Sequence, residues 1–215
     1  ILKKNPKKFY AVEKDDELAI LLNDKFSDEI TIINEDILKI SEDKISNEKL
    51  TVFGNLPYNI STEILSKWIT NLKKKIWFES LILMFQKEVA ERIIAKSNTS
   101  KYGRLSILSN WKLNIEKIID IKPQSFSPRP KIDSTLLLFT PREDYFELKD
   151  AKNLEMITRV FFSQRRKMLK KPFNQIFNNS KEVADKFNIN LNLRPQNLEP
   201  EVYFKLVKEY EDLRS

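Results

Sequence analysis

Residues 51–58 read Thr-Val-Phe-Gly-Asn-Leu-Pro-Tyr and combine a strand with the turn that ends it. The first three residues are β-branched or aromatic, which favours a strand. Pro57 has no N–H donor and does not fit a central strand, so the chain must leave the sheet there. Ser61 or Thr62 can then cap a helix that runs to about Leu72. The stretch therefore predicts a strand–turn–helix unit.

Strand and helix signals alternate on both sides of this unit through the first two-thirds of the chain. We expect strands at 9–12, 30–33, 51–53, 81–85, 115–121 and 135–140, and helices at 15–25, 61–72, 87–96 and 105–113. Asp15 is the expected cap of the first helix. The continuous apolar run at 81–85 is typical of a strand that is covered on both faces. The pattern predicts an α/β fold with a mostly parallel, doubly wound sheet.

After Pro141 the sequence predicts helices only. These are expected at 151–162, 165–177, 182–187 and 199–213. We therefore place a domain boundary in the segment 141–150, which gives an α/β domain at 1–143 and a small helical domain at 144–215.

Composition excludes several kinds of site. The 215 residues are 41% hydrophobic, which is enough for a core, and they include no Cys and no His. This rules out disulfides, thiolate or histidine metal sites, cysteine nucleophiles and Ser-His-Asp triads. No stretch approaches the roughly 20 consecutive apolar residues that span a bilayer, so we expect no membrane partner.

The charge distribution favours a polyanionic partner. The formal net charge is +7 and the sequence pI is about 9.3. From Met156 to Ser180 there is no acidic residue, whereas a solvated helix face usually carries both signs. The cations of this run are Arg159, Arg165, Arg166, Lys167, Lys170 and Lys171. The run indicates a surface for nucleic acid.

Three expected strands end in polar residues, namely Glu13, Asp36 and Asn55. Ligands of open α/β sheets bind at the carboxyl ends of the strands. One carboxylate can accept hydrogen bonds from ribose hydroxyls and the other from an adenine amine. Equally, both carboxylates can simply cap the helices that follow them.

The turn at 55–58 has a more specific chemistry. The side-chain carbonyl of Asn55 and the backbone carbonyl of Pro57 can accept both hydrogens of an aromatic amine. Tyr58 supplies a face on which a flipped base can stack. An ordinary turn at a strand exit remains the alternative for these four residues.

The sequence resembles the bacterial small-subunit (16S) ribosomal RNA adenine N6-dimethyltransferases. Five segments carry the resemblance, in order and across nearly the whole chain: Phe53–Thr62, Phe85–Arg92, Tyr102–Ser106, Phe126–Ser134 and Phe162–Lys167. The resemblance implies a Rossmann-like class I methyltransferase sheet with a small C-terminal all-helical domain. It also implies transfer of methyl groups from S-adenosylmethionine, without a metal, to N6 of two adjacent adenosines near the 3′ end of the RNA.

The resemblance also implies roles for individual residues. Glu13 would bind the cofactor ribose and Asp36 its adenine amine, with Ile37 packing nearby. Asn55 would face both the methyl donor and the target amine.

For the target base, Asn55 and the Pro57 carbonyl would orient the amine, while Tyr58 would stack on the adenine. Phe126 would form the opposite wall of the slot, although core packing is an alternative for this residue. The residues implied to bind RNA are Arg104, Arg165, Arg166, Lys167, Lys170 and Lys171.

One feature departs from the family pattern. Members have a first strand and a glycine-rich loop that holds the methionine part of the cofactor, but this sequence has only Gly54 and Gly103. We therefore expect that the natural protein is longer at its N-terminus and that the first strand and this loop precede Ile1.

Two other functions stay open from the sequence. The large-subunit adenine methyltransferases of macrolide resistance share an Asn-Ile/Leu-Pro-Tyr segment, although Leu56 and the segment Arg165–Lys167 favour the small-subunit enzyme. A non-catalytic factor of ribosome assembly is the other alternative. The expected partner is the small ribosomal subunit or its 16S RNA, bound by a monomer in the cytoplasm.

Overall fold

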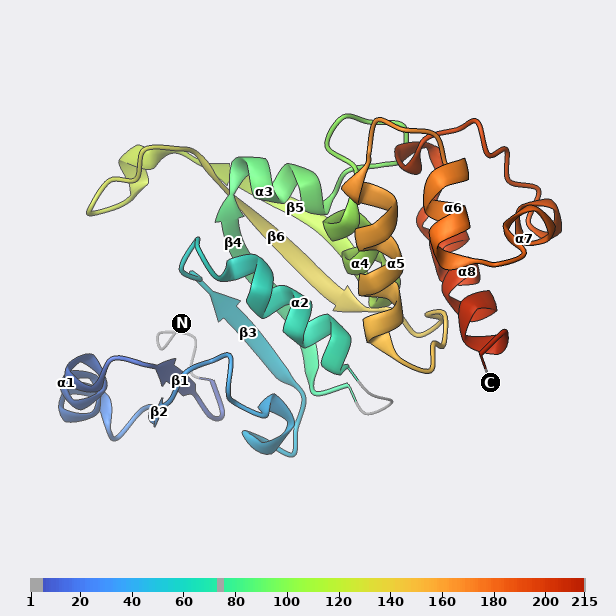
Figure 1. Cartoon of the computed structure of the whole chain (residues 1–215). Helices are drawn as coiled ribbons and strands as arrows, with labels where there is room; N and C mark the ends of the chain where they lie inside the picture. The colour runs from blue at the N-terminus through green and yellow to red at the C-terminus, as the bar shows by residue number, and fades with distance from the viewer. Residues whose placement is uncertain (1–5, 73–75, 215) are drawn as a thin grey trace. The chain divides into compact units, whose positions relative to one another are not determined.

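The computed structural model describes residues 6–72 and 76–214 (Figure 1). By its internal contacts the chain divides into two compact units, residues 1–50 and 51–215. The domain boundary expected at 143/144 lies within the second unit and stays a prediction.

The first unit contains a parallel pair of short strands. Strand β1 (Tyr10–Glu13) pairs with β2 (Thr31–Asn34), with Glu13 opposite Asn34, and helix α1 (Asp16–Phe26) connects them. The Asp15 carboxylate accepts the Leu18 N–H at 2.9 Å, which confirms the predicted cap. A short 3-10 helix, η2 (Glu42–Lys44), follows β2.

The second unit is built on a four-stranded sheet in the order β3-β4-β6-β5. Its strands are β3 (Leu50–Gly54), β4 (Phe78–Gln86), β5 (Leu113–Ile121) and β6 (Ser134–Pro141). The ladders β4–β6 and β5–β6 are antiparallel. The expected mostly parallel pairing is therefore wrong for the late strands, because β5 turns back into β6 through a loop without a crossover helix.

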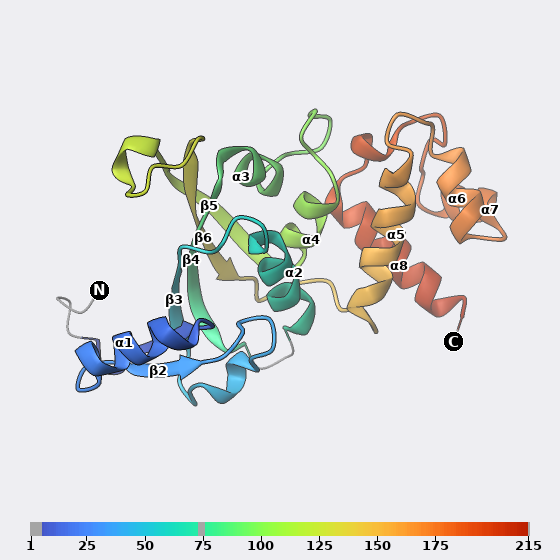
Figure 2. The same ribbon diagram turned by 60° about the vertical axis from the view of Figure 1, so that its left-hand side comes forward.

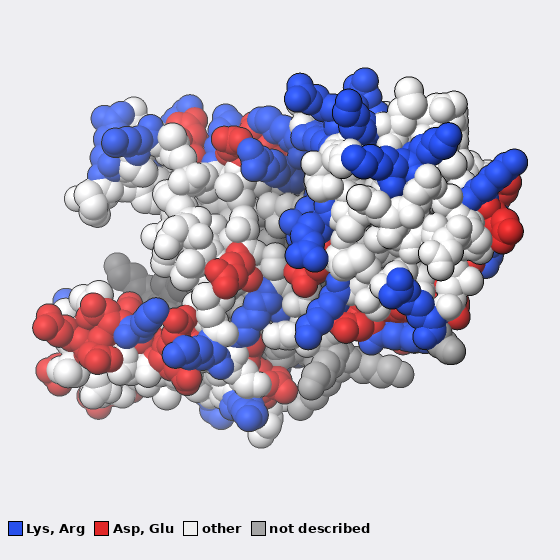
Figure 3. Space-filling view, in the orientation of Figure 1, with Lys and Arg blue, Asp and Glu red and all other residues white. Residues whose placement is uncertain are grey.

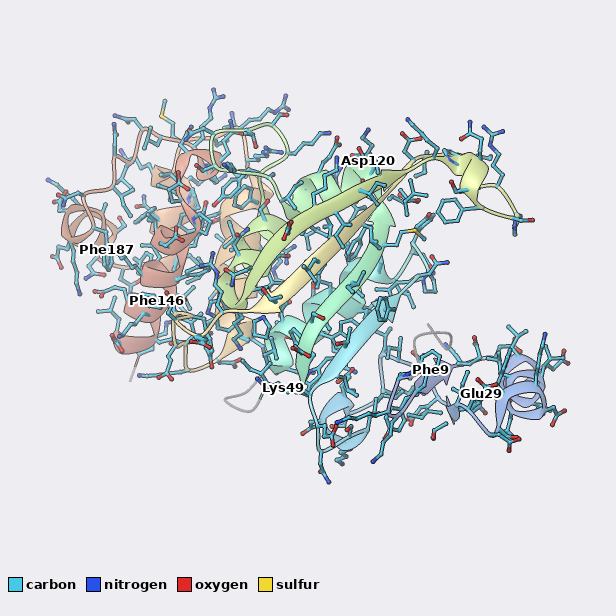
Figure 4. All side chains as sticks on the ribbon, turned by 180° about the vertical axis from the view of Figure 1, so that it is seen from behind. Phe9, Glu29, Lys49, Asp120, Phe146 and Phe187 are labelled. Atoms are coloured by element: carbon cyan, nitrogen blue, oxygen red, sulfur yellow. The ribbon has the colours of Figure 1, made fainter. Side chains whose placement is uncertain are left out.

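Helices α2 (Ser61–Asn71), α3 (Lys87–Ile93) and α4 (Arg104–Lys112) lie on one face of this sheet, and Figure 4 shows the sheet from its other side. The predicted inner face of α2 is buried, with Ile64, Leu65 and Ile69 fully inaccessible. Strand β4 is also buried as its apolar run predicts, since Leu81, Leu83 and Phe85 have no exposed surface.

Only helices follow β6 in the described chain. They are α5 (Ala151–Ser163), α6 (Lys170–Ile176), α7 (Ser180–Lys186) and α8 (Pro200–Asp212), with two short 3-10 helices, η3 (Pro123–Ser125) and η4 (Pro195–Asn197), elsewhere in this unit. Helix α5 packs against α4, α6 and α8 (Figure 2). The buried rings of Phe161, Phe173 and Tyr203 form the core of this helical part, with ring centroids 5.4 and 5.5 Å from Phe161.

The structure corrects the start of one helix. Residues 165–177 were expected to be helical, but α6 begins only at Lys170. The N–H groups of Leu169 and Lys170 donate to the carbonyls of Leu193 and Leu191, respectively. These two N–H groups are therefore bonded to a distant segment and not to a preceding helical turn. Pro172 is then the third helical residue, in the first turn, where its missing N–H has no cost.

The expected cap of α2 is also wrong. Ile60 occupies the cap position without a side-chain hydrogen bond. The Ser61 hydroxyl instead donates to the Tyr58 carbonyl at 3.2 Å and thus stabilises the preceding turn.

Gly54 ends β3 in a position with no room for a side chain. A Cβ atom there would lie 2.7 Å from Leu83 Cδ2 and 3.0 Å from Leu56 Cδ2. At Gly103 the nearest atoms, on Phe162, are 3.9 Å away, which is ordinary contact.

We predict that Gly54→Ala lowers the free energy of unfolding by about 1–3 kcal/mol, as overpacking does, since Leu83 is fully buried and cannot yield freely. Gly103→Ala is the control, and because Gly103 is the N-cap of α4, where Ala costs about 0.5–1 kcal/mol, its loss should be the smaller one. Urea unfolding of both variants measures these free energies. Equal losses of stability in the two variants would show that the close contact of Gly54 with Leu83 does not cause the effect.

Candidate functional site

In the first unit, Glu13 and Asp36 lie at the carboxyl end of the parallel pair. Glu13 is the last residue of β1, and Asp36 comes two residues after β2. One Glu13 oxygen, Oε1, accepts the Asp15 N–H at 2.8 Å. Because neighbouring strands lie about 4.8 Å apart, both carboxylates lie at the same end of this pair, where ligands of open α/β sheets bind.

Asp36 is held as a carboxylate. Its Oδ2 pairs with Lys14 Nζ at 2.8 Å and its Oδ1 accepts the Leu38 N–H at 3.0 Å. These two contacts, the Lys14 contact first, keep the pKa of Asp36 below its ordinary value. The Lys14 side chain is 74% exposed, so this ion pair is weak and Lys14 can give way to another donor. Ile37 beside it is half-buried.

In the second unit, the chain turns sharply after β3. Asn55 is exposed, and the Pro57 carbonyl accepts the Ile60 N–H at 3.1 Å. A carbonyl oxygen has two lone pairs, so the Pro57 carbonyl can accept a second hydrogen bond. That the Asn55 side-chain carbonyl and the Pro57 carbonyl together bind an amine stays a prediction.

Tyr58 connects this turn to the start of β6. Its hydroxyl lies 2.7 Å from the Ser134 hydroxyl, 76 residues away along the chain. Ser134 is fully buried and pairs with Gln86 at the end of β4 and with Ile121 at the end of β5. The turn and the connection from β5 to β6 therefore meet at one edge of the sheet.

The connection from β5 to β6, residues 122–133, is called here the β5–β6 loop. It contains the half-buried Phe126, directly after η3. Its last residue is fixed, since the Asp133 carbonyl accepts the Lys87 N–H at 3.0 Å and its carboxylate pairs with Lys122 at 2.7 Å. Phe126 thus lies in a loop that is anchored beside the Tyr58 contact.

Asp120 strengthens the base of this loop (Figure 4). Its carboxylate pairs with Lys117 at 2.8 Å, accepts the Thr135 hydroxyl at 2.6 Å and lies 3.6 Å from Lys87. The hydrogen bonds from Lys117 and Thr135 lower the pKa of Asp120 to about 2.

A separate cleft of about 670 Å³ lies between α5 and the helices α2, α3 and α4. Hydroxyls of Thr62 and Ser66 line it, together with the Phe162 ring. Its charged residues are Glu88, Arg92, Lys101, Arg104, Glu155 and Arg165. The size suits a small ligand or a single nucleotide.

The basic residues predicted for RNA do not form one group. Arg104 and Arg165 line the cleft, and Arg165 donates to the Thr99 and Ser100 carbonyls and to Gln196 Oε1. The remaining four are exposed and do not line it: Arg166, Lys167, Lys170 and Lys171.

Sequence reasoning missed two features of these sites. The contact of Ser134 with Tyr58 carried no local signal, although Ser134 is the last residue of the family-like segment Phe126–Ser134. Arg92 and Lys101 were missed as cleft residues because they are paired on the surface with Glu88 and Glu91 and stand outside the acid-free run.

The low pKa of Asp120 leads to a prediction about how the stability of the protein depends on pH. Its pKa in the folded protein lies below the ordinary value, so its contribution to stability is present above about pH 4 and is lost as the pH falls through about 2. We predict that Asp120→Asn flattens the acid limb of the stability curve between these values. Asp144→Asn, at an exposed residue with no ion pair among the described residues, is the control. Identical acid limbs for wild type and Asp120→Asn would contradict the prediction.

Comparison with known proteins identifies relatives along the whole chain. A ribosomal RNA small subunit methyltransferase A from Pelagibacter ubique is 77% identical over 214 residues, which cover 100% of this chain and 82% of that protein. The protein of the same name from a Wolbachia strain of Drosophila simulans is 39% identical over 217 residues, covering 99% and 78%.

Two solved structures share the fold. A dimethyladenosine transferase from Plasmodium falciparum gives a TM-score of 0.75 at 23% identity, over 96% of this chain and 82% of that one. The 23S rRNA methyltransferase ErmE gives 0.65 at 19% identity, over 98% and 84%. These likenesses confirm the predicted Rossmann-like methyltransferase fold with its C-terminal helices.

The family model for "Ribosomal RNA adenine dimethylase" matches residues 1–212. With this match and the relatives above, the chain belongs to the ribosomal RNA adenine dimethylase family.

Proposed function

We propose that the protein transfers methyl groups from S-adenosylmethionine to N6 of two adjacent adenosines near the 3′ end of small-subunit ribosomal RNA. The observation that carries the proposal is the meeting of two segments at one sheet edge. The turn with Asn55 and Pro57 is joined there, by the bond between Tyr58 and Ser134, to the start of β6, directly after the loop that contains Phe126. The names of the relatives support the choice of the small-subunit RNA.

Asn55 and Pro57 orient the target amine in this proposal. The lone pair of the adenine amine is delocalised into the ring, so the nitrogen is a weak nucleophile. Two carbonyl oxygens that accept both N–H groups favour a pyramidal nitrogen with an exposed lone pair. Orientation of this kind contributes much of a rate enhancement without a covalent intermediate.

Tyr58 and Phe126 hold the base. The Tyr58 hydroxyl is bonded to a buried serine, so its ring has a fixed orientation, and stacking on such a ring contributes about 1–3 kcal/mol per base. Phe126 provides the second wall from the anchored loop. Once the nitrogen is methylated its extra proton is acidic and can leave to water, so a dedicated base is optional.

Glu13, Asp36 and Ile37 bind the nucleoside end of the cofactor. The structure is compatible with this, because two carboxylates follow adjacent parallel strands and Glu13 retains an oxygen, Oε2, with no hydrogen bond among the described residues. When bound, S-adenosylmethionine supplies an activated methyl group on a sulfonium.

RNA is held through its phosphates. We assign this role to the cleft residues Arg104 and Arg165 and to four exposed cations after α5. These four are Arg166, Lys167, Lys170 and Lys171. Such phosphate contacts position the RNA without reading its sequence. None of the described helices is long and apolar enough to cross a membrane. We propose that the protein acts as a monomer.

The reaction is tested by incubating the full-length protein with labelled S-adenosylmethionine and undermethylated small ribosomal subunits, followed by nucleoside analysis. We expect N6,N6-dimethyladenosine at adjacent positions. Label in large-subunit RNA alone would assign the protein to the large-subunit activity. Tight subunit binding without transfer would favour an assembly factor.

We predict that Asn55→Ala lowers the single-turnover rate by about 10²–10³, the usual effect of removing one orienting group, while RNA affinity stays within about twofold. Asn114→Ala, at an exposed residue of β5, is the control and should have the wild-type rate. A lost RNA affinity with a normal rate would contradict the role of Asn55.

A further inference from the structure

The β5–β6 loop extends away from the sheet edge at the proposed methyl-transfer site (Figures 1 and 2). Its two ends are fixed by the contacts of Lys122 and Lys87 with Asp133. Between these anchors, residues 127–129 and 131–132 are exposed. The loop is therefore anchored at both ends and projects from the sheet beside the position proposed for the target base.

The charges of the loop differ between its base and its outer part. At the base, Lys87, Lys117 and Lys122 are each paired with Asp120 or Asp133. Farther out, Arg129 and Lys131 are exposed and have no ion pair or hydrogen bond among the described residues. Figure 3 shows Lys and Arg side chains gathered over this end of the protein. Two unpaired cations on a projecting loop are available for phosphates.

Between these cations and the fixed end of the loop lies Ile132, a branched apolar side chain that is 43% exposed. It follows Lys131 directly and comes two residues before Ser134, the partner of Tyr58. At about 3.3 Å per residue, its Cα is within roughly 7 Å of the Ser134 Cα. Along the chain, an exposed apolar residue thus lies between the unpaired cations and Ser134, the partner of Tyr58.

We infer that Ile132 inserts into the RNA stack in place of the target adenine, while Arg129 and Lys131 hold the flanking phosphates. This inference rests on the proposed function. Removing a base from its stack costs a few kcal/mol, and enzymes that act on bases must supply it. Apolar side chains that enter between base steps stabilise the opened RNA. Ile132 is therefore a positioning residue, which acts by making the adenine available to Asn55 and Tyr58.

The test compares two synthetic RNAs that carry the target adenosines. In one the adenosines are stacked normally, and in the other abasic nucleotides flank them, so that no stacking has to be broken. We expect Ile132→Ser to lower the single-turnover rate of the full-length protein by about tenfold or more on the stacked RNA, a loss that corresponds to part of the unstacking cost. On the abasic RNA, the variant should be within about twofold of wild type, because no base stack remains to be opened.

The matched control is Ile118→Ser, the same change at a residue of β5 that is 48% exposed. It should have the wild-type rate on both RNAs. A normal rate of Ile132→Ser on stacked RNA, or an equal loss on both RNAs, would overturn the inference. Wild-type protein that methylates neither these RNAs nor undermethylated small ribosomal subunits would instead refute the proposed function, so the two failures are distinguishable.

The phosphate contacts have a separate readout. For the variant Arg129→Gln/Lys131→Gln, the slope of log association constant against log salt concentration should become shallower by about 1.4–1.8 units, since each phosphate contact contributes about 0.7–0.9. Lys205→Gln, at an exposed residue of α8, should leave the slope unchanged. An unchanged slope for the double variant would show that these cations do not bind phosphate.

Discussion

The hydrogen bond between the hydroxyls of Tyr58 and Ser134 joins two segments that the chain presents 76 residues apart. The ladders of β3, β4 and β6 bring both segments to the same end of the sheet, and this bond fixes the Tyr58 side chain relative to the β5–β6 loop. Ser134 is fully buried at the start of the central strand β6, so the bond fixes the Tyr58 ring against the sheet. A stacking surface needs a fixed ring. Because the Tyr58 ring is already ordered in the folded protein, only the base loses conformational freedom when it binds.

The close packing at Gly54 serves the same end. Because Gly54 has no side chain, β3 can approach Leu83 of β4, and the turn that follows starts from a defined position. At the end of β5, Asp120 and Asp133 fix the base of the β5–β6 loop through ion pairs with Lys87, Lys117 and Lys122. The proposed chemistry needs no acid–base residue, so it depends on these positioning contacts more than on any reactive group.

Local patterns predicted much of this structure. The apolar spacing of α2, the Asp15 cap and the buried run of β4 were read correctly, since each is decided by neighbours in the sequence. The start of α6 was misplaced because Leu169 and Lys170 bond to residues more than 20 positions away. The partner of Tyr58 was missed for the same physical reason. Long-range contacts leave no local trace, and the resemblance to a family supplied the roles that spacing alone left open.

The central claim is that the bond between Tyr58 and Ser134 positions the two halves of the methyl-transfer site. A double-mutant cycle on the single-turnover rate tests it most directly, with Tyr58→Phe, Ser134→Ala and both together in the full-length protein. The account predicts similar losses for both single variants and no further loss in the double variant, because each change removes the same interaction. Losses that add, or single variants with the wild-type rate, would contradict it.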